Sequence, residues 1–248
     1  SLVLGLRGSM HGWRWDLSGN YGSNRVSYDT INSVNLDLYR QQGLTQTGFH
    51  DGLLKASQVS ANLDISKDLD IPWLPNPVTL AFGGQFMRQN YWIAEGEPAS
   101  YEQTGAQGFG GFRPGDAGSW SRDDFAEYVN AETNLTDKFG ASLSLRHENY
   151  SDFGGATIGS GAFRYDFTAR FALRAGVANG FREPSLAQQH YAYTSSSCYG
   201  PGNGIGVPPG IYGSALVSPT SLVGRLLGGE PLKPEHSRNY TFGAVWNP

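Results

Sequence analysis

Apolar and polar residues alternate with a period of two in many segments of this chain, and this alternation constrains its fold more than any other feature. Residues 13–21 show it clearly, because Trp13, Trp15, Leu17, Gly19 and Tyr21 alternate with polar residues. Neighbouring side chains of a β-strand point to opposite faces, so each such segment predicts a strand with one apolar and one polar face. The pattern recurs at residues 58–65, 139–146, 162–167, 171–178 and 239–246. With residues 2–10, 78–92 and 125–135 added, the sequence predicts about nine long strands.

The connections between these strands fall into a short and a long class that alternate along the chain. Short turns are expected near Gly12, at residues 136–138 and at 166–170, with a somewhat longer one at 67–77. Long connections are expected at residues 29–51, 93–122 and 183–236, and residues 151–155 are a short exception among them. Long structureless connections count against a compact soluble domain, whereas outer-membrane β-barrels have short turns at one end and long loops at the other.

The sequence therefore predicts an all-β, antiparallel transmembrane barrel. A barrel strand needs only about 9–11 residues with every second side chain apolar, so no long apolar stretch is required. Nine strands would place the two edge strands in the same direction, while bacterial single-chain barrels use even numbers. The chain also starts inside a predicted strand and stops where a short turn would follow, so we expect a section of a larger barrel. The alternative is a soluble β-sandwich, whose apolar rows would pack together in a dry core.

Composition excludes several other classes of protein. The 34 glycines and the 13% aromatic content are typical of many-stranded β-proteins and disfavour an all-α fold. The 18 basic and 22 acidic residues include no basic block, so we expect no nucleic-acid partner. His147 and Glu148 are strand neighbours that point to opposite faces, and no serine-hydrolase elbow, zinc-protease or calcium-loop motif occurs. We therefore expect no enzyme activity, no metal site and no cofactor.

Four motifs resemble those of TonB-dependent outer-membrane receptors. Residues 180–186 read Gly-Phe-Arg-Glu-Pro-Ser-Leu, and residues 231–235 read Pro-Leu-Lys-Pro-Glu, followed by Ser-Arg-Asn-Tyr at 237–240. Residues 146–154 read Arg-His-Glu-Asn-Tyr-Ser-Asp-Phe-Gly, which is similar to a hairpin of these receptors. Residues 96–101 and 111–118 look like outer-loop sequences of one branch of the family. The resemblance covers residues 1–248 as the middle to later part of the barrel domain, with extracellular loops at about 93–122 and 183–236.

The resemblance implies a barrel of about 22 strands around a plug domain, located in the bacterial outer membrane. It implies active uptake of a scarce ligand, such as a ferric siderophore, cobalamin or a carbohydrate, driven through TonB. The expected partners are outer-membrane lipid, the plug, the remaining barrel strands, the TonB complex and the small-molecule ligand. The plug, the TonB box and the closing strands are not recognisable in this sequence. A small structural or adhesive outer-membrane barrel without transport is the alternative function.

Strand alternation and the motifs together identify candidate plug-contacting charges. Alternation places Arg174 and Arg182 on the polar face, and Glu235 shares its parity with Asn239 and Thr241. A lipid-facing Arg or Lys costs about 2–4 kcal/mol at the bilayer midplane, so these charges should face the barrel lumen. The resemblance implies that Arg182 and Glu235, together with Glu183, contact the plug. The alternative is that they are ordinary hydrated lumen charges.

Aromatic and cationic residues of the long connections are the candidates for ligand binding. Rings and guanidinium groups suit aryl siderophores and sugars alike. Packing within the loops or contact with lipid headgroups is the alternative role for each of them. The candidates are Tyr101, Phe109, Phe112, Arg113, Trp120, Tyr191, Tyr193, Tyr199 and Tyr212.

Overall fold

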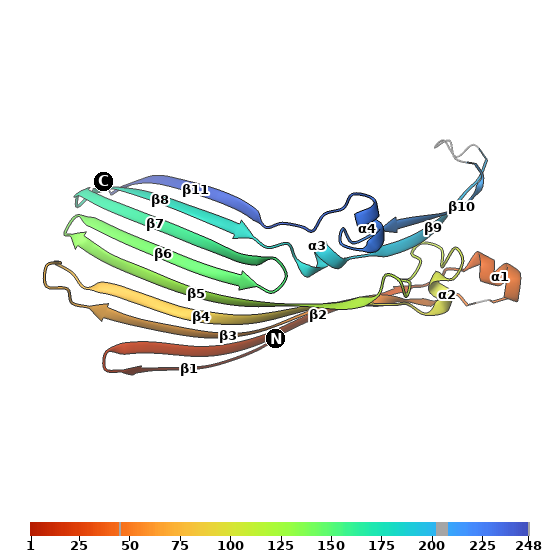
Figure 1. Cartoon of the computed structure of the whole chain (residues 1–248), viewed down its shortest axis with the longest axis horizontal. Coiled ribbons are helices and arrows are strands. Elements are labelled where there is room, and N and C mark those ends of the chain that lie inside the picture. Colours follow the sequence, from red (N-terminus) through yellow and green to blue (C-terminus); the bar gives the residue numbers. More distant parts are fainter. Residues whose placement is uncertain (45, 202–207, 248) are drawn as a thin grey trace.

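The computed structural model describes residues 1–44, 46–201 and 208–247. Its main element is a nine-stranded antiparallel sheet in the order β1-β2-β3-β4-β5-β6-β7-β8-β11 (Figure 1), and β9 and β10 form a separate two-stranded sheet. In the described part of the chain, β1 and β11 do not pair with each other, so the sheet is not closed. The elements are β1 (Leu2–Met10), β2 (Trp13–Thr30), α1 (Leu36–Gln42), β3 (Phe49–Leu69), β4 (Val78–Ala94), α2 (Pro98–Tyr101), β5 (Gly118–Thr136), β6 (Phe139–Tyr150), β7 (Gly154–Thr168), β8 (Phe171–Arg182), α3 (Leu186–His190), β9 (Tyr193–Tyr199), β10 (Gly210–Leu216), α4 (Leu222–Leu226) and β11 (Glu235–Trp246).

The main sheet confirms the prediction of a partial antiparallel barrel with nine long strands. Several strands are longer than predicted, with 18 residues in β2, 21 in β3 and 19 in β5. Since about 9–11 residues suffice to cross the hydrocarbon region, these strands extend well beyond it. As a result, Trp120 belongs to β5 and Glu235 belongs to β11, although the sequence places both in long connections.

Short turns and long connections lie at opposite ends of the sheet, as predicted (Figure 1). In the turn between β1 and β2, His11 and Gly12 both have positive φ, at 53° and 80°, which a type I′ hairpin turn requires. The expectation that the long connections are structureless is wrong. Asn35, Ser185 and Ser221 each accept a hydrogen bond from a backbone N–H in the first turn of a short helix, which explains α1, α3 and α4. The β9–β10 hairpin and α2 account for further structure there.

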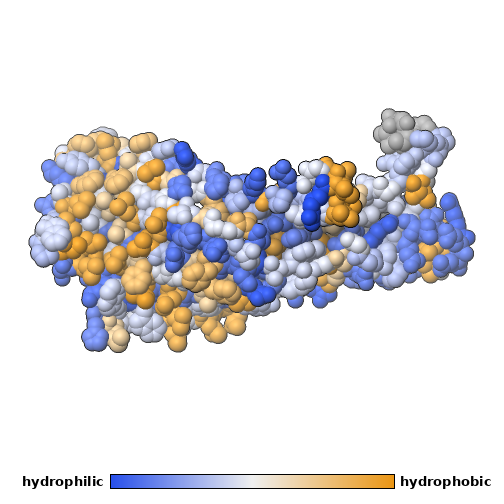
Figure 2. All heavy atoms as spheres, viewed as in Figure 1, coloured by the Kyte–Doolittle hydropathy of each residue, from blue (hydrophilic) through white to orange (hydrophobic). Residues whose placement is uncertain are grey.

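The two faces of the main sheet differ as the alternation predicts. Leu17 is the register partner of both Leu6 and Leu63, so these side chains share one face. They are exposed, as are Leu143 at 56% and Phe242 at 81%, and Figure 2 shows apolar side chains gathered at the short-turn end. Exposed apolar rows contradict the soluble sandwich, which would bury them between two layers. We call the two sides of the sheet the apolar face and the polar face.

Among the described residues, the helices are too short or too polar to cross a membrane.

Candidate functional site

Aromatic side chains gather on the polar face at the end of the sheet that carries the long connections. Phe112 is only 1% exposed, and its ring lies edge-on to Tyr193 at 5.7 Å between centroids. Phe109 stacks on Tyr193 at 4.9 Å. Each such pair contributes about 0.5–1.5 kcal/mol beyond area burial, so these contacts join residues 95–117 to the connection after β8. We call the group the outer aromatic cluster; it comprises Tyr28, Tyr91, Phe109, Phe112, Trp120, Tyr191 and Tyr193, packed with Leu54, Ile93, Leu186 and Ala187.

At the edge of this cluster, Trp120 of β5 stacks on His190 of α3. The rings of Trp120 and His190 lie 4.9 Å apart and are nearly parallel, at 6°. Burial lowers the pKa of His190, and the nearby Asp152 opposes this effect without cancelling it. Burial also raises the pKa of Tyr191 and of Tyr193. The packed state therefore favours the neutral His190 ring, and the protonated hydroxyls of Tyr191 and Tyr193 remain available as hydrogen-bond donors.

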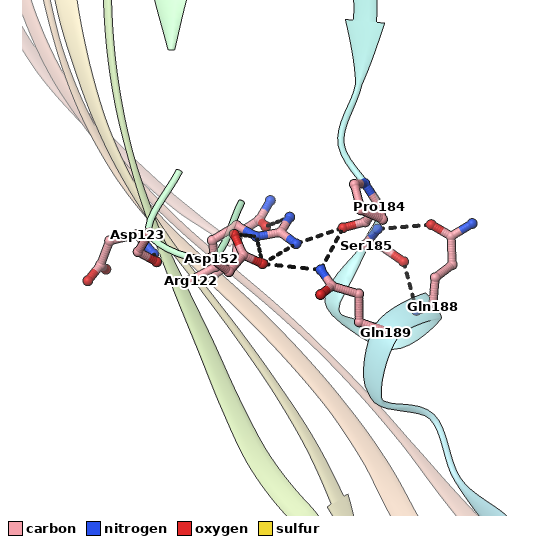
Figure 3. A network of polar contacts seen from close by, with 9 residues as sticks. Arg122, Asp123, Asp152, Pro184, Ser185, Gln188 and Gln189 are labelled. Atoms are coloured by element: carbon pink, nitrogen blue, oxygen red, sulfur yellow. Dashed lines mark hydrogen bonds and ion pairs between the residues drawn. The ribbon is translucent and has the colours of Figure 1, made fainter. Parts of the chain in front are cut away.

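A buried arginine fixes the start of α3 next to the cluster (Figure 3). The Arg122 side chain is 0% exposed and its Nη2 lies 2.8 Å from Oδ2 of Asp152. The same Nη2 donates a hydrogen bond to the carbonyl oxygen of Pro184 at 2.7 Å. Gln189 of α3 also donates to both Asp152 and Pro184, at 3.1 and 3.3 Å. Strand β5, the β6–β7 turn and the segment after β8 are thereby joined at one point.

Residues of the sequence motif at 180–186 also stabilise the start of α3 at this junction. Ser185 and Gln188 form a capping box, in which each side chain accepts a hydrogen bond from the other residue's backbone N–H at 3.1 and 2.9 Å. Such a reciprocal pair satisfies two free N–H groups of a helix start. Leu186 of the motif is 6% exposed and packs in the outer aromatic cluster. The motif therefore determines where the long connection begins.

The predicted plug-contacting charges lie on the polar face. Arg182 and Glu235 are direct register partners between β8 and β11, both are exposed, and in the described part of the chain no ion pair joins them. Glu183 is half-buried and interacts electrostatically with Asp124 and Tyr150. The structure thus brings Arg182 and Glu235 together and places Glu183 closer to β5 and β6.

Two further carboxylates lie near Glu183, and neither is among the site residues predicted from the sequence. Asp124 is 2% exposed, and among the described residues its Oδ1 has no hydrogen-bond partner. Glu148 accepts hydrogen bonds from Tyr150 at 2.5 Å and from Arg146. Glu148 could have been selected from the sequence, because its even position in the motif at 146–154 places it on the polar face. Asp124 carries no comparable sequence signal.

The chain matches a family model along almost its whole length. The model is that of the TonB dependent receptor-like β-barrel, and it matches residues 2–248. The chain belongs to the β-barrel family of TonB-dependent receptors. This is an outer-membrane family of receptors and transporters, not a class of enzymes. No match is found among curated protein sequences.

Solved structures of TonB-dependent receptors share the fold of this chain. The siderophore receptor PirA from Acinetobacter baumannii is 15% identical, with a TM-score of 0.63, over 99% of this chain and 32% of PirA. The ferric enterobactin receptor PfeA from Pseudomonas aeruginosa, as a Q482A mutant in complex with enterobactin, is 19% identical, with a TM-score of 0.65, over 99% of this chain and 32% of PfeA. PirA from Pseudomonas aeruginosa is 16% identical, with a TM-score of 0.60, over 98% of this chain and 35% of that receptor. The chain thus spans about a third of the length of these TonB-dependent receptors.

The candidate ligand-binding residues of this TonB-dependent receptor chain divide into two groups. Phe109, Phe112, Trp120, Tyr191 and Tyr193 lie in the outer aromatic cluster, which also contains Tyr28 of β2 and Tyr91 of β4. The remaining candidates lie outside it. Tyr101 lies in α2, and Tyr199 and Tyr212 pack on each other at 5.6 Å in the β9–β10 hairpin.

Arg113 links two connections instead of pointing freely outward. Its Nη2 donates hydrogen bonds to the carbonyl oxygen of Gln103 at 3.2 Å and to Ser196 Oγ at 2.9 Å. Its Nε is buried and has no partner within the described residues. The side chain therefore ties residues 95–117 to β9, and any ligand contact would use the remaining donor capacity of the guanidinium.

Within the described ranges, no group of three or more His, Cys, Asp or Glu side chains could hold a metal ion. His147 lies on the apolar face and bonds through Nδ1 to Thr157 Oγ1 at 2.8 Å, while Glu148 lies on the polar face. The two side chains do not form an acid–base pair.

Proposed function

We propose that this chain forms part of the barrel of an outer-membrane receptor that takes up a ferric siderophore in a TonB-driven step. The observation that carries the proposal is the position of the outer aromatic cluster. It lies on the polar face, which lines the bore of a closed barrel, and at the end with long connections, which faces the outside of the cell. A ligand that arrives from outside would meet these rings before reaching the narrower bore.

The cluster has the chemistry that aryl iron-chelating groups require. Tyr28, Phe109, Tyr191 and Tyr193 are partly exposed, so each ring packs on one side and presents its remaining surface. Rings stack favourably on aryl groups, and the protonated tyrosine hydroxyls can donate to phenolate oxygens. The likeness to siderophore receptors, one of them in complex with enterobactin, supports a ferric siderophore over cobalamin or a carbohydrate.

We also propose that Arg182, Glu183 and Glu235 contact a plug domain inside the barrel. All three lie at the ends of β8 and β11 nearest the long connections, and Glu183 lies near the carboxylates of Asp124 and Glu148. This negative region would pair with basic side chains of a plug, while Arg182 would pair with an acidic one. The remaining barrel strands and the TonB complex are the other partners that the proposal requires.

The test is siderophore uptake by the complete receptor that contains this chain. The gene is expressed in cells that lack their own siderophore receptors, and entry of ⁵⁵Fe bound to aryl and to hydroxamate siderophores is measured with and without TonB. We expect TonB-dependent entry of aryl siderophore iron. The double variant Phe109→Ala/Tyr193→Ala should bind the ligand about tenfold more weakly, because two stacking rings are lost.

The matched control is Tyr199→Ala/Tyr212→Ala, which removes two packed rings outside the cluster and should leave uptake unchanged. Uptake that is identical without TonB would contradict the proposal. Absence of uptake for every iron source, combined with retained attachment to a surface, would favour the adhesive barrel instead.

A further inference from the structure

The apolar rows of the sheet end before the strands do, and basic residues follow them at the end with long connections. In β2 the row on the apolar face runs from Trp13 to Tyr21, and Arg25 follows four residues later on the same face. In β3 the row ends at Val59, and Lys55 lies four residues beyond it in the same outward direction. Both basic side chains therefore lie on the membrane-facing side, past the apolar band.

Arg25 and Lys55 are direct register partners. Side chains in such positions have Cβ atoms about 4.5–5.5 Å apart, and like charges placed there are destabilising. Within the described residues, neither forms an ion pair. Two adjacent cations without a counter-charge are a site at which an anion would relieve repulsion.

Several other basic residues of the sheet are neutralised by carboxylates of the protein itself. Arg88, on the same face, lies 3.7 Å from Asp123. On the polar face, Arg14 lies 2.9 Å from Asp68 and Arg164 lies 2.7 Å from Asp166. The Arg25–Lys55 pair differs from these because its neighbours supply no carboxylate.

The position of the pair relative to the bilayer indicates what anion would reach it. Four residues span about 13 Å along a strand, which is about 10 Å of height at a barrel tilt of about 40°. The headgroup layer is about 5–8 Å thick on each side of the hydrocarbon region, so the backbone at the pair lies at its outer edge and the long basic side chains can reach back into it. Lys55 Nζ also lies 5.0 Å from the ring centroid of Trp92, and Trp is enriched at this interface.

We propose that Arg25 and Lys55 bind the phosphate groups of a lipid in the outer leaflet of the outer membrane. The acyl chains of this lipid lie against the apolar rows that end at Tyr21 and Val59, and Trp92 packs beside the headgroup. The proposal rests on the outer-membrane location assumed under the proposed function. It does not depend on the siderophore, because the pair lies on the opposite face from the outer aromatic cluster.

The test is binding of a bis-phosphorylated lipid, purified lipid A, to the complete receptor in neutral detergent. Each basic residue near an anionic surface contributes about 1 kcal/mol, so Arg25→Gln/Lys55→Gln should weaken binding about 30-fold, which corresponds to about 2 kcal/mol. The matched control is Arg164→Gln/Arg174→Gln, which changes two register partners on the polar face and should leave the affinity unchanged. Binding to the wild type should also weaken with salt and be lost with a dephosphorylated lipid.

Equal lipid affinity of the wild type and Arg25→Gln/Lys55→Gln would overturn the proposal, as would equal binding of the dephosphorylated lipid. Displacement of the lipid by millimolar inorganic phosphate would assign the pair to a soluble anion and would also overturn it. Without lipid, the variant should unfold at the same temperature as the wild type or higher, because repulsion is removed. Iron uptake is measured in parallel, so loss of lipid binding with retained uptake leaves the proposed function intact.

Discussion

The guanidinium of Arg122 donates hydrogen bonds to both carboxylate oxygens of Asp152, with Nε–Oδ1 and Nη2–Oδ2 distances of 3.0 and 2.8 Å. The arginine side chain is fully buried, while that of Asp152 is 27% exposed. Phe153 and Tyr150 place their rings 5.1 and 5.7 Å from the guanidinium carbon. The carbonyl oxygen of Pro184 accepts a hydrogen bond from the same guanidinium. The Arg122–Asp152 pair therefore determines how the connection after β8 lies on β5.

Removing one partner of this pair should loosen that connection. Breaking a buried ion pair costs about 3–5 kcal/mol, since the remaining charge is left without compensation. We therefore expect Asp152→Ala to unfold at lower denaturant concentration and to expose residues 183–191 to protease. The control is Asp166→Ala, whose pair with Arg164 is exposed and should contribute at most about 1 kcal/mol. Equal losses for the two variants would contradict the assigned role.

The stack of His190 on Trp120 should depend on pH. Burial lowers the pKa of His190 from its ordinary value of about 6.5, so the packed state favours the neutral ring. The stabilisation is fully present above about pH 6.5 and is lost as the pH falls through the lower folded-state pKa. The protection factors of the α3 amides, which correct for the intrinsic pH dependence of hydrogen exchange, should therefore be lower at pH 5 than at pH 7.5. His190→Phe should abolish this difference in protection, while His147→Phe should retain it; equal protection at the two pH values in the wild type would refute the expectation.

The two faces of the sheet should respond differently to an added charge. Leu143 and Ser144 are neighbours in β6, on the apolar and the polar face. Arg at a lipid-facing position costs about 2–4 kcal/mol near the midplane, so Leu143→Arg should lower the free energy of unfolding in lipid vesicles by that amount. Ser144→Arg should cost less than about 1 kcal/mol, because water hydrates the bore. Similar losses at both positions would contradict the assignment of the faces.

The strands could be predicted from sequence because their signal is local. One strand suffices to show that Leu17 and Asp16 face opposite sides, and the parity of Arg182 and Glu235 follows in the same way. The junction around Arg122 could not be predicted, since its partners Asp152 and Pro184 lie 30 and 62 residues away in sequence. The outer aromatic cluster falls between these cases: its loop rings could be selected as aromatic residues, whereas Tyr28 and Tyr91 join it only because the connections fold back over the polar face.

The register pairing of Arg182 with Glu235 allows the plug hypothesis to be separated from a simple cross-strand contact. If the two residues only attract each other, the exchanged variant Arg182→Glu/Glu235→Arg keeps opposite charges in register and should behave like the wild type. If each pairs with a plug charge, the exchange places both beside like charges. We then expect the complete receptor to lose siderophore uptake and its plug to become accessible to protease, while Arg164→Glu/Asp166→Arg, an exchange within another polar-face pair, retains both. Normal uptake by the exchanged variant, together with unchanged uptake by Glu235→Gln, would exclude plug contact at this position, because neither charge would then matter beyond β8 and β11.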